Sequence, residues 1–187
     1  IGILRLQERQ RTRLFLRRDP FGRFTSALVF VPRDRFNTEL RIKIGNELMA
    51  ALDSAGVAPE GRFFPDTYAY SKGSSDLAVL KRSLRAMRTR LDAAWAERAS
   101  DTPLRSADDA LVLASIVEKE TGTAADRGRI AGVFTNRLRI GMPLQTDPTV
   151  IYGLGAAFDG NLRKRDLQAD TPYNTYLRAG LPPTPIA

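Results

Sequence analysis

The chain has 187 residues, 43% hydrophobic and 27% charged, which fits one globular domain or two small ones, and no apolar run approaches the ~18 residues of a membrane span. It has no Cys and no His, so Cys nucleophiles, Ser-His triads and almost every zinc site are excluded, no metal or other cofactor is expected, and carboxylates, Lys, Tyr, Ser and Thr remain for chemistry. Of the net charge of +8, residues 1–47 carry +6 and residues 48–187 only +2, so nucleic acid is not an expected partner of the larger region.

The first part of the chain has the pattern of a β-hairpin followed by a helix. In residues 12–17, Arg13, Phe15 and Arg17 alternate with Leu14 and Leu16, which is the pattern of a β-strand. Residues 24–31 form a second run rich in Phe and Val. Residues 19–22, Asp-Pro-Phe-Gly, have turn chemistry between these runs. Asn37 then has the character of a helix cap, and the helix is expected to continue through Leu48.

Three helices are predicted in the larger region. The first is long and begins at Asp76, the second covers about residues 109–121 after a cap at Ser106 or Asp108, and the third begins at Asp126. The last forty residues read as loops, with turns at Asp147-Pro148 and around residues 171–174. We therefore expect an α+β chain, in which a β-hairpin and helix fragment over residues 1–47 is unrelated to a mostly α-helical domain with irregular loops over residues 48–187.

The most informative carboxylate lies at the end of the second predicted helix. Leu113, Ile116 and Val117 form an apolar stripe, and the next position on that stripe is Glu120, whereas Glu118 falls nearer the flank. This placement points the Glu120 carboxylate toward a pocket, where burial and the negative end of the helix would both disfavour ionisation, as a general acid requires. Spacing alone also allows a simpler interpretation, in which the helix end frays and Glu120 is exposed to solvent or pairs with an Arg.

The segments after the third helix gather side chains of the kind that bind sugars. Sugars are held by amide and carboxylate hydrogen bonds and by stacking on aromatic rings. The pattern alone favours the other interpretation, that these segments are ordinary turns with a buried Tyr. The side chains concerned are Gln145, Thr146, Asp147, Tyr152, Tyr173, Asn174, Thr175 and Tyr176.

Several blocks of the larger region resemble the endolytic murein transglycosylase family, also called MltG or YceG-like. They occur in the same order as in that family and cover residues 48–187. Thr184 stands where the family usually has Gly. The blocks are Glu60-Gly61-Arg62-Phe63-Phe64-Pro65-Asp66-Thr67-Tyr68, Ala114-Ser115-Ile116-Val117-Glu118-Lys119-Glu120-Thr121, Ala131-Gly132-Val133-Phe134 with Asn136-Arg137-Leu138, residues 141–153, Pro172-Tyr173-Asn174-Thr175-Tyr176 and Gly180-Leu181-Pro182-Pro183.

The resemblance implies a lysozyme-like, YceG-like catalytic domain that acts without a cofactor. It implies a lyase that cleaves the bond between N-acetylmuramic acid and N-acetylglucosamine in nascent peptidoglycan strands and leaves 1,6-anhydro ends. It makes Glu120, the second Glu of the Glu-Lys-Glu motif, the catalytic residue. The substrate-binding residues that it implies are Asn136, Gln145, Thr146, Asp147, Tyr152, Tyr173, Asn174 and Tyr176.

The same resemblance gives expectations for partners and location. Peptidoglycan glycan strands and peptidoglycan synthases are the expected partners. The family acts on the periplasmic face of the inner membrane, through an anchor that is missing from this chain, together with a small LysM-like domain. The family also continues beyond Ala187 into a segment that completes the domain. If the acid's pocket is incomplete, the alternative is a non-catalytic peptidoglycan-binding fragment.

Residues 1–47 show a different resemblance. Residues 17–24, with the sequence Arg-Arg-Asp-Pro-Phe-Gly-Arg-Phe, and residues 31–38 resemble a stretch of the large bacterial NAD-dependent glutamate dehydrogenases, outside their catalytic core. The sequence thus reads as a join of two unrelated segments near residue 47. The dinucleotide-binding glycine fingerprint is missing, so no dehydrogenase activity is expected, although a regulatory fragment of a dehydrogenase remains a third hypothesis.

Overall fold

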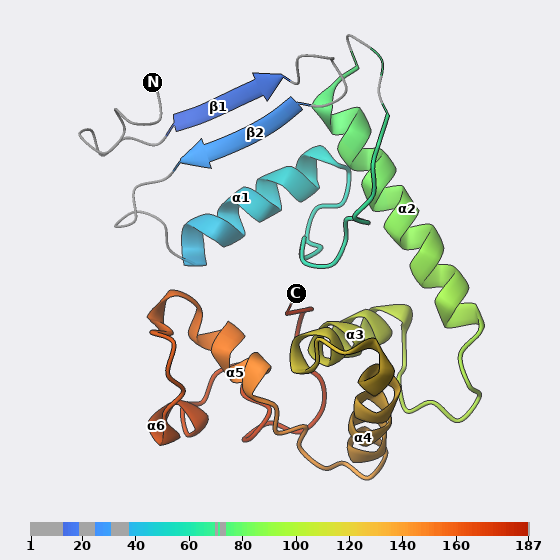
Figure 1. The fold of residues 1–187 in the computed structure, drawn as a ribbon, viewed down its shortest axis with the longest axis vertical. Coiled ribbons are helices and arrows are strands. Elements are labelled where there is room, and N and C mark those ends of the chain that lie inside the picture. Colours follow the sequence, from blue (N-terminus) through green and yellow to red (C-terminus); the bar gives the residue numbers. More distant parts are fainter. Residues whose placement is uncertain (1–12, 19–24, 31–37, 70, 72–73, 187) are drawn as a thin grey trace. The chain divides into compact units, whose positions relative to one another are not determined.

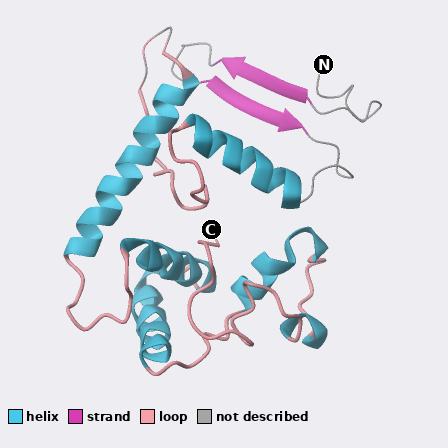
Figure 2. Cartoon of the chain, turned by 180° about the vertical axis from the view of Figure 1, so that it is seen from behind, coloured by secondary structure: helices cyan, strands magenta, loops and turns pink. Residues whose placement is uncertain are grey.

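The computed structural model describes residues 13–18, 25–30, 38–69, 71 and 74–186, and the side chains among them from residue 43 onward. Helices make up most of the regular structure in these residues, as the cyan elements of Figure 2 show. The chain divides into two compact units. The N-terminal unit contains Ile1–Val57 and Pro65–Ser83, and the C-terminal unit contains Ala58–Phe64 and Leu84–Ala187.

Two strands and a helix form the first part of the N-terminal unit (Figure 1). Strand β1 (Arg13–Arg18) pairs antiparallel with β2 (Thr25–Phe30), with a register that places Arg13 opposite Phe30 and Arg18 opposite Thr25. Strand β1 overlaps the predicted run over residues 12–17, and β2 lies within the run over residues 24–31. The predicted turn over residues 19–22 lies outside the described residues, so the complete hairpin stays a prediction.

Helix α1 (Thr38–Ala51) continues across residue 47. Met49 and Leu52 are buried, with 0% and 3% of their surface exposed. Asn37, the predicted cap of this helix, lies outside the described residues. The expected join near residue 47 would therefore fall inside a continuous helix, and it stays a prediction.

The C-terminal unit contains the helices that the sequence predicts. Helix α2 (Asp76–Ala96) enters this unit at Leu84, and α3 (Ala107–Glu120) and α4 (Arg127–Arg139) follow it. Of the two caps considered for α3, Ser106 is the one used, because its side chain accepts a hydrogen bond of 3.1 Å from the Asp109 amide. A short 3₁₀ turn, η2 (Ala124–Asp126), leads into α4.

The prediction that the last forty residues are loops was wrong in one important respect. Asp147 and Pro148 open a helix, α5 (Asp147–Leu154), where the sequence analysis placed a turn. Proline suits the first helical turn because its fixed φ is already helical and its missing N–H would have no partner there. Asp147 adds a negative charge near the positive end of the helix. After it come a 3₁₀ turn, η3 (Gly155–Ala157), and the short α6 (Lys164–Leu167).

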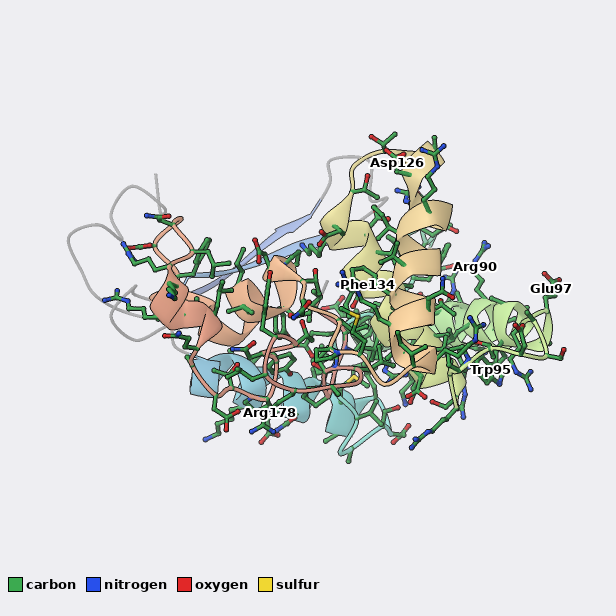
Figure 3. The ribbon with its side chains drawn as sticks, turned by 90° about the horizontal axis from the view of Figure 1, so that it is seen from below. Arg90, Trp95, Glu97, Asp126, Phe134 and Arg178 are labelled. Atoms are coloured by element: carbon green, nitrogen blue, oxygen red, sulfur yellow. The ribbon has the colours of Figure 1, made fainter. Side chains whose placement is uncertain are left out.

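The core of the C-terminal unit is built around α3. Its buried side chains Val112, Leu113, Ile116 and Val117 pack with Phe134 of α4 and with Leu144 and Ile186. Figure 3 shows Phe134 of α4 among the packed side chains, whereas Asp126, the residue just before α4, lies beyond the outer end of that helix.

A buried hydroxyl on α3 ties the end of the chain to this core. The Ser115 hydroxyl donates to the Val112 carbonyl at 2.7 Å and accepts a hydrogen bond of 2.9 Å from the Ile186 amide. The segment Ala58–Phe64 is fixed to the first turn of α3 by the ion pair between Arg62 and Asp108, with an N–O distance of 2.6 Å. This ion pair lowers the pKa of Asp108.

Deleting residues 1–47 tests whether the core of the C-terminal unit stands by itself. The deletion removes both strands and most of α1 but no member of the core cluster. We expect the free energy of opening, measured by amide hydrogen exchange along α3, to change by no more than ~1–2 kcal/mol. Ile116→Ala in the full-length chain serves as the positive control, because emptying this buried site should cost ~2–5 kcal/mol. Loss of α3 protection in the deletion variant would contradict the expectation.

Candidate active site

Glu120 is the last residue of α3, and its carboxylate is held by a hydroxyl from the next part of the unit. Thr146 Oγ1 donates to Glu120 Oε2 at 2.7 Å. The side chain of Glu120 is exposed, so the expectation of a buried carboxylate was wrong. The reason is that Val117 is the last buried residue of the apolar stripe, and α3 ends at Glu120 itself. No further helical turn packs over the Glu120 side chain.

Glu118 has a different partner. Its carboxylate faces the Arg127 guanidinium through two contacts, Nε to Oε2 at 2.9 Å and Nη2 to Oε1 at 3.0 Å. The pairing with an Arg that the sequence left open for Glu120 is thus made by Glu118. The two carboxylates of the Glu-Lys-Glu motif therefore face different environments: one is neutralised by an arginine, and the other is bonded to a neutral hydroxyl.

Asp147 and Tyr176 form a second pair beside Glu120. The Tyr176 hydroxyl donates to Asp147 Oδ1 at 2.6 Å. This hydrogen bond, followed by burial and by the negative charges of Asp147 and Glu120, raises the pKa of Tyr176 to about 12, against a smaller opposing effect of Arg137. The phenol therefore lies within electrostatic reach of both carboxylates. Arg137 itself donates a hydrogen bond to the Leu144 carbonyl.

Tyr152 and Tyr173 pack against each other. Their ring centroids are 4.8 Å apart, with the planes tilted by 57°. The Tyr152 hydroxyl donates to Glu60 Oε1 at 3.2 Å, and the Tyr173 hydroxyl lies 2.7 Å from Thr184 Oγ1. Both hydroxyls therefore have protein partners, and the pair ties α5 to the segment Ala58–Phe64 and to the end of the chain.

Asn174 is fully buried and has a structural role. Its side-chain amide donates to the carbonyls of Leu167 and Ala169, at 3.0 and 2.7 Å. Its side-chain oxygen accepts from the Tyr176 amide at 2.9 Å. Because both donors are used inside the fold, this geometry does not support the predicted contact between Asn174 and substrate.

Asn136 and Gln145, the remaining predicted site residues, are exposed. The Asn136 side-chain oxygen accepts from Arg139 at 2.7 Å, on α4. Gln145 adopts φ of 51° and donates its amide to the Thr175 carbonyl at 3.0 Å, immediately before Thr146. The structure thus places Thr146, Asp147 and Tyr176 with Glu120, whereas the described contacts of Asn136 belong to its own helix.

Sequence reasoning missed three residues that shape this site. Glu60, Arg137 and Thr149 were noted only as parts of motif blocks and were not selected as site residues. For Thr149 the available signal was the repeat Thr146-x-x-Thr149. At a helix start, a Thr hydroxyl can donate to the carbonyl of the residue three positions earlier. No comparable pattern joins Glu60 to Tyr152, which lie 92 residues apart.

Two negative findings apply to the described part of the chain. It contains no group of three or more acidic, His or Cys side chains that could hold a metal ion. None of its helices combines the length and the apolar character needed to cross a membrane.

The Tyr176–Asp147 pair gives a prediction about pH. The pKa of Tyr176 is raised from 10.0 to about 12, so the stabilisation from its protonated phenol is fully present below pH 10 and is lost as the pH rises through 12. In a titration of tyrosinate absorbance, Tyr176→Phe should remove the group that ionises near pH 12. Asp147→Asn should return the Tyr176 pKa toward 10, because the charged acceptor is gone. Asp159→Asn, at an exposed ion pair with Arg163, should leave the titration unchanged, and an identical change in both Asp variants would contradict the assignment.

Known proteins resemble this chain in sequence and in fold. The endolytic murein transglycosylase of Bacillus subtilis is 41% identical over 129 residues, 68% of this chain and 35% of that protein. The crystal structure of a yceG-like protein from Listeria monocytogenes superposes with a TM-score of 0.61 and 30% identity, over 83% of this chain and 56% of that one. The chain thus spans about a third of the length of the Bacillus relative.

A second similarity covers a shorter stretch. The NAD-specific glutamate dehydrogenase of Halomonas elongata is 56% identical over 54 residues, which are 29% of this chain and 3% of the dehydrogenase. The YceG-like family model matches residues 9–187, a range that includes most of the segment set apart in the sequence analysis. On the extent of that match, the chain belongs to the YceG-like family.

Proposed function

We propose that this chain carries the catalytic site of an endolytic lytic transglycosylase, which cuts peptidoglycan glycan strands between N-acetylmuramic acid and N-acetylglucosamine. The observation that carries the proposal is the position of Glu120: an exposed carboxylate at the end of α3, bonded to the Thr146 hydroxyl and separate from the Glu118–Arg127 pair. The name of the Bacillus relative supports the same activity. Exposure leaves this carboxylate accessible to a polymer.

The proposed reaction needs one carboxylate in two protonation states. Protonated Glu120 donates its proton to the glycosidic oxygen as the bond to C1 breaks. The resulting carboxylate then takes the proton from the C6 hydroxyl of the muramyl sugar, and that oxygen attacks C1 to give the 1,6-anhydro ring. Hydrolases normally need two carboxylates, but here the nucleophile belongs to the substrate, so no second carboxylate has to activate water.

Asp147 and Tyr176 are proposed to contact the sugar beside the reacting bond. Asp147 is exposed, and its carboxylate has accepting capacity beyond the one bond from Tyr176. Tyr176 is half-buried and offers an aromatic face near Glu120. A sugar bound there would also exclude water from Glu120, which would strengthen its interactions during proton transfer.

The finer expectations belong to the same proposal. They are a lysozyme-like mode of catalysis, action at the periplasmic face of the inner membrane through an anchor, and cooperation with peptidoglycan synthases. A non-catalytic peptidoglycan-binding fragment is the second candidate, because the exposed Glu120 carboxylate lacks the buried pocket that the sequence predicts for a general acid. Release of 1,6-anhydro-ended fragments from purified glycan strands separates the two.

Paired substitutions in the Glu-Lys-Glu motif test the catalytic assignment. Glu120→Gln keeps the shape of the side chain but can neither give nor take the proton, so the rate should fall by ~10²–10⁴-fold or more. Glu118→Gln is the matched control, because it loses only an exposed ion pair worth about 0–1 kcal/mol. The assay is release of 1,6-anhydro ends, with circular dichroism to verify folding. An active Glu120→Gln beside an inactive Glu118→Gln would overturn the assignment.

A further inference from the structure

Two buried threonines, Thr149 and Thr175, bond the peptide groups of a third, Thr146. The Thr146 amide donates to Thr175 Oγ1 at 3.2 Å, and the Thr146 carbonyl accepts from Thr149 Oγ1 at 2.7 Å. Thr149 Oγ1 and Thr175 Oγ1 lie 2.8 Å apart. Thr146, Thr149 and Thr175 expose 2%, 0% and 2% of their surfaces, so water does not compete for these bonds.

Proton counting gives the direction of every bond in this group. Each hydroxyl has one proton. Thr149 uses its proton on the Thr146 carbonyl, so in the contact between the two hydroxyls Thr175 must be the donor. The bonds therefore run in one direction around a closed circuit, from the Thr146 amide to Thr175, from Thr175 to Thr149, and from Thr149 back to the Thr146 carbonyl. Bonds arranged in such a series polarise and strengthen one another.

We propose that this threonine ring, Thr146 with Thr149 and Thr175, positions the catalytic carboxylate, an inference that rests on the proposed function. The ring holds both peptide groups of Thr146 and thereby fixes the direction of its side chain, whose hydroxyl bonds Glu120. Thr149 and Thr175 are positioning residues that act through Thr146. Thr146 itself is assigned to the carboxylate rather than to the substrate, because it is buried and its hydroxyl faces Glu120.

A hydroxyl is the suitable partner for a group that must change its protonation state. It donates to the carboxylate and can accept from the carboxylic acid without moving. A Lys or Arg in this position could only donate and would hold Glu120 as the anion. The exposed Glu120 would otherwise sample several rotamers, so a fixed hydroxyl also limits where the proton is delivered.

The backbone before Thr146 carries a second sign of positioning. Gln145 has φ of 51°, a conformation that residues other than Gly adopt only when their surroundings hold them. Its amide donates to the Thr175 carbonyl at 3.0 Å, so Thr175 receives two successive amides of this segment, one on its carbonyl and one on its hydroxyl. Thr175 is therefore the residue through which the ring is best tested.

The test compares Thr175→Val with Thr175→Ser, since valine keeps the shape and serine keeps the hydroxyl. Thr175→Val should lower kcat by about 10²-fold with little change in KM, the loss typical of a misplaced reacting group, and Thr175→Ser should restore most of it. Thr146→Val should behave like Thr175→Val. Thr123→Val, at an exposed threonine without a side-chain capping bond, is the matched control and should keep wild-type kinetics.

Amide hydrogen exchange at Thr146 gives a readout that does not depend on activity. The ring predicts a protected Thr146 amide that loses protection in Thr175→Val and regains it in Thr175→Ser, while the α3 amides stay protected in both variants. Loss of α3 protection in Thr175→Val would show that this variant unfolds. The kinetics of Thr175→Ser and Thr146→Val would then decide whether the threonine ring positions Glu120. If Glu120→Gln is inactive but Thr146→Val and Thr175→Val are fully active, the ring proposal is wrong and the catalytic assignment stands. If Glu120→Gln is itself active, the proposed function fails instead.

Discussion

The packing of α3 is the constraint on which the rest of the C-terminal unit depends. Four of its apolar side chains contact α4, Leu144 and the end of the chain, and the Ser115 hydroxyl bonds the amide of Ile186. Leu144 is fully buried against this helix, and it lies only two residues before Thr146. The same apolar contacts that stabilise α3 therefore bring the Thr146 segment to the end of the helix, where Glu120 is located.

Periodicity predicted the helices well because their apolar stripes are real core faces. Leu113, Ile116 and Val117 were expected to be buried, and they are. The same rule failed one turn further on, at Glu120, because helical spacing says which face a residue occupies but not where the helix ends or what covers that face. The Glu118–Arg127 pair depends in turn on the position of α4, which spacing within α3 cannot supply.

The site beyond α3 was predictable only in part. Residue chemistry selected Thr146, Asp147 and Tyr176, which do lie with Glu120. Residue chemistry could not separate them from Asn174. Its amide could equally hydrogen-bond a sugar, but in the fold it donates to the backbone carbonyls of Leu167 and Ala169. Asp147-Pro148 was read as a turn because local sequence alone does not distinguish a turn from the first turn of a helix. The difference matters, since a helix start places Thr149 one turn from Thr146 and makes the ring possible.

The N-terminal part of the chain leaves two observations that point in different directions. The similarity to a glutamate dehydrogenase covers 29% of the chain, whereas the YceG-like family model begins at residue 9. Helix α1 crosses the expected join without interruption, and Met49 is buried in the N-terminal unit. Among the residues whose side chains are described, the core cluster around α3 includes none before Leu104, so the packing that places Glu120 is argued without the first segment.

The two exposed carboxylates of the site each accept a hydrogen bond from a hydroxyl, and the two hydroxyls differ in how firmly the fold holds them. The Tyr176 pKa of about 12 means that its proton stays on the phenol across the physiological range, so the phenol remains a hydrogen-bond donor to Asp147. The aliphatic hydroxyl of Thr146 likewise keeps its proton, but both peptide groups of Thr146 are bonded to buried threonines, whereas Tyr176 is only half-buried. The hydroxyl that bonds Glu120 is therefore the more firmly placed of the two, as the proposed proton transfer requires.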